Sequence, residues 1–155
     1  QAYRWFEDPL PDNDLSGWVH LRSKLQTPLA GVDAVRFTTA DYGPAIASGA
    51  FDIVRMDAAR QGISQLYALG KLATGFGLGV EGHAFGPALA QAANLQTGLA
   101  LEGARYCELP VPIGGLDVGV NEGLTLDAEG FVEAPTLPGL GMTVDEDALA
   151  RVTLD

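Results

Sequence analysis

Short apolar runs recur along the chain at a nearly constant interval, and each run ends at an ionisable residue. The runs occupy residues 3–6, 28–32, 51–56, 78–82 and 105–107. Each run is short enough to be a buried β-strand. The residues that end the runs are Glu7, Asp33, Asp57, His83 and Glu108. Because these end residues lie 24 to 26 positions apart, the pattern predicts a repeated unit with one strand in each.

Helical patterns fill the intervals between the apolar runs. The predicted helices cover residues 15–25, 40–47, 63–73 and 87–97. Asp14 and Thr39 are favourable N-caps for the first two, and Gly75 ends the third. A repeated strand and helix predicts parallel strands joined by right-handed crossovers, and therefore an α/β fold.

Two α/β architectures contain this repeat, the doubly wound sheet and the closed eight-stranded barrel. The barrel places functional residues at the carboxyl ends of several strands, whereas the doubly wound sheet gathers its site at one switch point. Five successive strand ends with ionisable residues favour a (β/α)8 TIM-type barrel. A complete barrel takes about 250 residues. We therefore interpret residues 1–112 as the last five βα units of a partial barrel, with the remaining strands expected upstream of Gln1.

Residues 113–155 break the repeat and form a tail. A turn at residues 127–130, between two short apolar segments, predicts a β-hairpin. Asp145 can cap a short helix over residues 146–151. We expect this tail to pack on the barrel or on an N-terminal capping domain.

The amino-acid composition argues against two kinds of partner, nucleic acids and membranes. Nine Lys and Arg residues against twenty Asp and Glu residues give a net charge of −11, which disfavours a nucleic-acid partner. Apolar residues make up 47% of the chain, as in globular proteins, yet no apolar run is long enough to span a membrane. The single cysteine, Cys107, fits a reducing compartment, so we expect a cytoplasmic protein.

The residues at the strand ends have a chemistry of their own. Glu7 and Asp33 would lie side by side and repel each other, and a hard cation with oxygen ligands, such as Mg²⁺, would resolve this repulsion. Asp57 beside His83 would fix the imidazole tautomer and make the ring a general acid or base. Taken singly, each side chain could be a solvated loop residue, and Glu108 could instead connect the tail to the barrel. The five-fold series favours a site.

At this point the chain resembles the mandelate racemase-like subgroup of the enolase superfamily. No single motif carries the resemblance, which rests on an ordered set of segments over nearly the whole chain. The segments are WFEDP at 5–9, PLA at 28–30 with Asp33, DIVRMD at 52–57, QGI at 61–63, VEGH at 80–83, YCEL at 106–109 and PGLG at 138–141.

The resemblance implies a role for each residue of the series. Glu7 and Asp33 match the second and third metal-binding carboxylates, and Asp57 and His83 match the Asp–His dyad. Glu108 matches a glutamate that hydrogen-bonds the substrate carboxylate. Members of this subgroup abstract a proton α to a carboxylate while Mg²⁺ stabilises the resulting charge.

Three features depart from the subgroup pattern. The third metal ligand is Asp33 where Glu is usual, and Gln61 stands where a Gly-Gly pair usually begins. The first metal ligand and the second-strand lysine motif have no counterpart, so we expect them upstream of Gln1, together with a capping domain.

The resemblance favours a Mg²⁺-dependent acid-sugar dehydratase in which His83 protonates the departing β-hydroxyl, and it implies a homo-oligomer when the protein is complete. The alternative activity is a racemase or epimerase of a 2-hydroxy acid that uses the same dyad. A non-catalytic half-barrel is the alternative of another class, because five strands cannot close a barrel and would leave exposed edges.

One further expectation concerns the layer beneath the site. Arg55 and Glu81 precede Asp57 and His83 by two positions, so each pair shares one face of its strand. We expect Arg55 and Glu81 to point into the barrel and to pair with each other, because a lone buried charge is costly.

Overall fold

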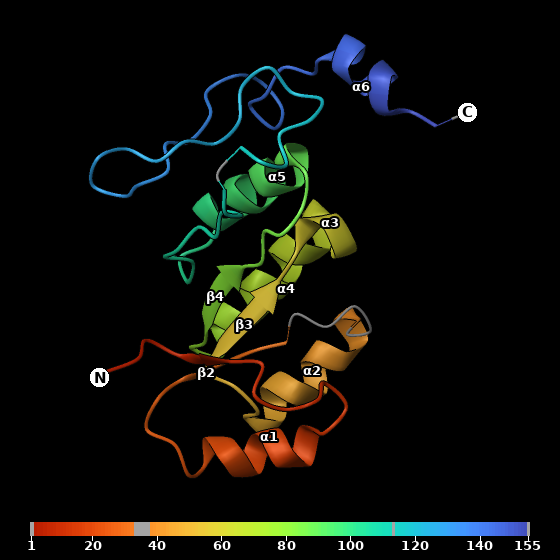
Figure 1. Ribbon diagram of the computed structural model, residues 1–155. Coiled ribbons are helices and arrows are strands. Elements are labelled where there is room, and N and C mark those ends of the chain that lie inside the picture. The colour runs from red at the N-terminus through yellow and green to blue at the C-terminus, as the bar shows by residue number, and fades with distance from the viewer. Residues whose placement is uncertain (1, 33–37, 113, 155) are drawn as a thin grey trace.

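The computed structural model describes residues 2–32, 38–112 and 114–154. Within these ranges four short strands form one parallel sheet in the order β1-β2-β3-β4 (Figure 1). The strands are β1 (Phe6–Glu7), β2 (Leu29–Gly31), β3 (Ile53–Met56) and β4 (Gly79–Gly82). Strands that follow one another in the sequence are neighbours in the sheet, as expected of successive βα units. The predicted α/β fold with a parallel sheet is confirmed.

One helix or a pair of helices follows each strand, as the sequence predicts, and a further helix lies in the tail. They are α1 (Leu15–Arg22), α2 (Thr39–Ser48), α3 (Ala58–Gln61), α4 (Ile63–Gly75), α5 (Ala88–Leu99) and α6 (Glu146–Val152). The N-cap of α2 is Thr38 rather than Thr39, because the Thr38 backbone N–H donates to the Asp41 carboxylate at 2.7 Å. The short helix α3 was not predicted, since a four-residue helix has too few turns to give a periodic pattern.

The predicted fifth strand, over residues 105–107, is wrong. Only a single parallel bridge forms there, between Cys107 and Gly82. The backbone N–H groups of Arg105 and Tyr106 donate to the Glu81 carboxylate, at 3.4 and 2.9 Å, instead of to a neighbouring strand. The N–H groups of residues 105 and 106 thus donate to a side chain of β4 rather than to its backbone.

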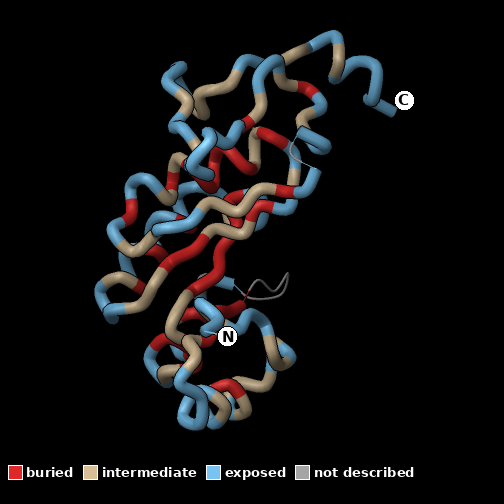
Figure 2. Tube along the Cα trace, turned by 60° about the vertical axis from the view of Figure 1, so that its left-hand side comes forward, coloured by how far each residue is buried: buried red, intermediate tan, exposed pale blue. Residues whose placement is uncertain are grey.

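The apolar core lies between the sheet and the helices. Val54 and Met56 of β3 and Val80 of β4 are buried in one cluster with side chains from α1, α2 and α4. The buried parts of the chain follow the strands and the helices beside them (Figure 2). Because side chains alternate along a strand, Arg55 and Glu81 point to the side of the sheet away from this core. Their predicted direction is therefore confirmed.

The tail beyond residue 113 contains the predicted turn and helix. Leu126 and Val132 form an antiparallel bridge, and the Asp127 carboxylate accepts backbone N–H groups within the turn between them. The Asp145 side chain caps α6 by accepting from the N–H of Ala148 at 2.8 Å. Figure 1 shows the tail beyond α5, at the end of the molecule opposite to α1. The boundary between barrel and tail stays a prediction.

Among the described residues, no helix combines the length and the apolar character needed to cross a membrane.

Candidate active site

The predicted site residues that the structure describes lie at the carboxyl ends of the strands. They are Glu7, which ends β1, Asp57, which follows β3, His83, which follows β4, and Glu108, which follows the bridge to β4. Asp33, the second predicted metal ligand, lies outside the described residues. The repeat spacing therefore does place these four residues at one edge of the sheet, while their catalytic roles stay predictions.

Asp57 and His83 face each other across the ends of β3 and β4. Asp57 Oδ2 lies 3.4 Å from His83 Nδ1, at the long end of hydrogen-bond reach. Both residues are held by the main chain: the His83 N–H donates to the Met56 carbonyl at 2.7 Å, and Asp57 Oδ1 accepts from the Ala59 N–H at 2.8 Å. Because Asp57 is only 5% exposed, its contact with the ring is shielded from water. A carboxylate that faces one ring nitrogen leaves the imidazole able to exchange a proton through the other.

Asn94 of α5 is a site residue that sequence reasoning missed. Its Nδ2 donates to Asp57 Oδ1 at 3.0 Å and to the His83 carbonyl at 2.7 Å, so one amide contacts both residues of the dyad. It is buried, at 6% exposure. The available signal was an asparagine, a poor helix former, inside the alanine-rich helix of residues 88–99.

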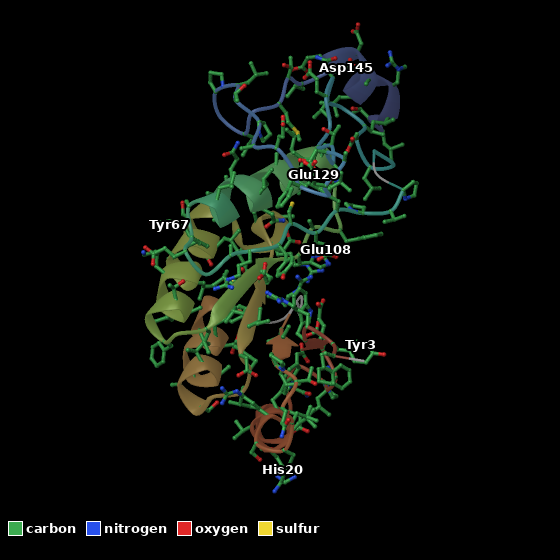
Figure 3. The ribbon with its side chains drawn as sticks, turned by 90° about the vertical axis from the view of Figure 1, so that its left-hand side faces the viewer. Tyr3, His20, Tyr67, Glu108, Glu129 and Asp145 are labelled. Atoms are coloured by element: carbon green, nitrogen blue, oxygen red, sulfur yellow. The ribbon has the colours of Figure 1, made fainter. Side chains whose placement is uncertain are left out.

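Arg55 occupies the centre of the charged cluster. Its Nη2 lies 3.2 Å from Glu7 Oε1 and also forms an ion pair and hydrogen bond with Glu108 Oε2. Its Nη1 donates to the carbonyl of Gly82 at 3.3 Å. The guanidinium side chain is 5% exposed, whereas the two carboxylates are 36% and 38% exposed. Figure 3 shows Glu108 on the side of the sheet away from the helices.

The expected direct pairing of Arg55 with Glu81 is therefore wrong, although the two residues are register partners in β3 and β4. Glu81 accepts the backbone N–H groups of Arg105 and Tyr106 instead, and Arg55 turns to Glu7 and Glu108. Burial raises the pKa of the Glu81 carboxyl, and its two backbone donors and the nearby Arg55 charge oppose this shift. The physical reason is that each charged group already has partners of its own: the Glu81 carboxylate has two backbone N–H groups, and the Arg55 guanidinium has two carboxylates.

The described residues fit a Mg²⁺ ion only in the type of donor they offer. In the described ranges, no group of three or more His, Cys, Asp and Glu side chains is arranged to hold a metal. Glu7 supplies carboxylate oxygens, the donor that Mg²⁺ prefers, but these face N–H groups of Arg55 and Trp5 at 3.2 and 2.9 Å.

Comparison with known proteins decides the family. The sequence model of the enolase C-terminal domain-like family matches residues 1–148. The chain belongs to this family. One curated relative, D-galactarolactone cycloisomerase of Agrobacterium fabrum (strain C58), is 30% identical to this chain over 158 residues. That alignment covers 95% of this chain and 41% of the relative.

Solved structures agree with the family assignment. A structure assigned to the mandelate racemase/muconate lactonizing enzymes, from Pseudovibrio sp., superposes with a TM-score of 0.92 at 28% identity, covering 99% of this chain and 41% of that one. An enolase from alpha proteobacterium bal199, described with bound Mg, gives a TM-score of 0.79 at 25% identity, covering 96% and 38%. The chain thus spans about two fifths of the length of the family proteins that it matches.

Proposed function

We propose that the complete protein is a Mg²⁺-dependent acid-sugar dehydratase. The observation that carries the proposal is the Asp57–His83 pair at the carboxyl edge of the sheet, beside Glu108, in a member of the enolase C-terminal domain-like family. Racemases and cycloisomerases among the similar proteins support acid–base chemistry at carbon.

In this proposal the His83 imidazole carries the proton that moves from the α-carbon to the departing β-hydroxyl. Asp57 faces Nδ1 at 3.4 Å, which favours a proton on Nδ1 in the neutral ring and leaves Nε2 for exchange with the substrate. The bond between the α-carbon and its hydrogen breaks as Nε2 of the imidazole takes the proton, a carbon–carbon double bond forms, and the β-hydroxyl leaves as water after it receives that proton from the imidazole. The resulting enol then rearranges to a 2-keto-3-deoxy acid.

The substrate carboxylate would be bound by three acidic residues, Glu7, Asp33 and Glu108. Glu7 and Asp33 would hold Mg²⁺, which supplies Lewis-acid stabilisation of negative charge. Glu108 would hydrogen-bond the carboxylate, and Arg55 fixes the positions of both Glu7 and Glu108 through its Nη2. A small acid sugar, rather than a polymer, is the proposed substrate. Assembly of the complete protein as a homo-oligomer in the cytoplasm belongs to the same proposal.

A second candidate function is the cycloisomerisation of a sugar-acid lactone, which the relationship to D-galactarolactone cycloisomerase favours. The same proton would leave the α-carbon, but the β-substituent that departs would be the ring oxygen, so no water is released. The dyad would play the same part in either reaction.

Proton NMR in D₂O with the complete protein, Mg²⁺ and panels of acid sugars and their lactones tests the proposal. A dehydratase removes the α-proton signal and produces a 2-keto-3-deoxy acid. A lactone that isomerises without loss of water identifies the second candidate. Exchange of the α-proton for deuterium with an unchanged carbon skeleton identifies the racemase alternative. If none of these three reactions occurs with any compound of either panel, the proposal is contradicted.

A further inference from the structure

Asn94 makes three hydrogen bonds in the interior, all at the dyad. Its Oδ1 accepts from the N–H of Ala58, the residue directly after Asp57, at 2.7 Å. Its Nδ2 donates to Asp57 Oδ1 at 3.0 Å and to the carbonyl of His83 at 2.7 Å. One side chain on α5 therefore connects the ends of two neighbouring strands.

These contacts allow only one orientation of the amide. If the oxygen and nitrogen exchanged places, the oxygen would face a carboxylate and a carbonyl, and the nitrogen would face the N–H of Ala58. All three contacts would then be repulsive. The network thus has no alternative hydrogen-bonded state in which the amide is reversed.

The carboxylate of Asp57 is oriented by this amide. Its Oδ1 accepts from both Asn94 and the Ala59 N–H, so Oδ2 is the oxygen that faces the imidazole. Arg60 Nε lies 3.7 Å from the same Oδ2 and is a competing partner. Without Asn94, Oδ1 would keep one neutral donor, and the carboxylate could rotate toward Arg60.

We infer that Asn94 is a positioning residue: it holds Asp57 and His83 in the mutual geometry that fixes the imidazole tautomer. The expected change in kcat rests on the proposed function, whereas the expected change in the His83 tautomer does not. Outer residues that orient the ligands of a metal site change affinity or activity by about ten- to hundredfold when they are replaced, and we expect an effect of the same size for a residue that orients the dyad.

The test reads the imidazole directly, in the complete protein. The ¹⁵N shifts of His83, identified by their loss in His83→Asn, report the tautomer at a pH where the ring is neutral. Asn94→Leu keeps the size but removes all three bonds, and Asn94→Asp keeps only the acceptor for Ala58. Gln91→Leu is the matched control, because Gln91 is equally buried on α5 but donates to the Gly86 carbonyl.

We expect a preference for protonated Nδ1 in the parent protein and in Gln91→Leu, and a mixed tautomer population in both Asn94 variants. The value of kcat should fall about ten- to hundredfold in the Asn94 variants, with KM changed far less. An unchanged tautomer in either folded Asn94 variant overturns the inference.

Hydrogen exchange of the Asn94 side chain in the parent protein tests the inference even if the variants do not fold. Both Nδ2 protons of Asn94 should exchange slowly with solvent in the parent protein, and fast exchange of both overturns the inference. A tautomer change in a protein that turns over no acid sugar or lactone would support Asn94 and contradict the proposed function, so the two failures are distinguishable.

Discussion

Arg55 and Glu108, 53 residues apart in the sequence, form an ion pair at the carboxyl edge of the sheet. The same guanidinium nitrogen lies 3.2 Å from Glu7. A buried cation on β3 thus connects the first strand of the sheet with the segment that follows the last one. This contact brings the predicted metal ligand and the predicted substrate-binding residue to one point.

Arg55→Met should lower the free energy of unfolding by about 1–2 kcal/mol. Loss of one partner of a fully buried pair costs more, but Glu7 and Glu108 are each over a third exposed and water can solvate them. Urea denaturation measures the change. The control is Arg22→Met, which breaks the more exposed pair with Asp52 and should cost less than about 1 kcal/mol. Equal costs for the two variants would contradict a special role for Arg55.

Glu81→Gln should become more stable, relative to the parent protein, as pH rises above 4.5. Burial raises the pKa of Glu81 above its ordinary 4.5, so the folded state holds this proton more tightly than the unfolded state does. The parent therefore loses stability as pH rises through the raised pKa, whereas glutamine has no proton to lose. Urea denaturation of both proteins over a pH series tests the sign. A difference that stays constant, or that grows in favour of glutamate, would show that burial does not control this carboxyl.

Glu7→Gln should weaken Mg²⁺ binding to the complete protein by at least about tenfold, because replacement of even an outer residue of a metal site has an effect of this size. Calorimetric titration measures the affinity. Glu129→Gln, in the exposed turn of the hairpin, is the control and should bind as the parent does. Parent-like affinity of Glu7→Gln would remove Glu7 from the metal site.

The elements that the sequence predicts well are those whose signal is local. β2 is buried along its whole length, so its short apolar run is informative, and α4 has a clear helical period with a glycine at its end. The spacing of the repeat then places Glu7, Asp57 and His83 at one edge, because parallel strands share their carboxyl ends.

The features that the sequence did not predict depend on contacts between distant segments. Arg55 was expected to pair with Glu81, its neighbour in register, but its reach along the sheet edge to Glu7 and Glu108 is set by tertiary packing. The fifth strand is reduced to a single bridge, and the N–H groups of residues 105 and 106 donate to the Glu81 side chain. Asn94 joins the dyad from a helix outside the strand-end series, so no strand pattern could reveal it.

The most direct test of the central claim, that Asp57 and His83 form an acid–base pair, is steady-state turnover of the identified acid sugar or lactone by His83→Asn in the complete protein. His20→Asn is the control, since His20 lies on α1 at the far end of the molecule from Glu108 (Figure 3). We predict a loss of about a hundredfold or more in kcat for His83→Asn, parent-like turnover for His20→Asn, and unchanged Mg²⁺ affinity in both. Turnover by His83→Asn at the parent rate would contradict the account.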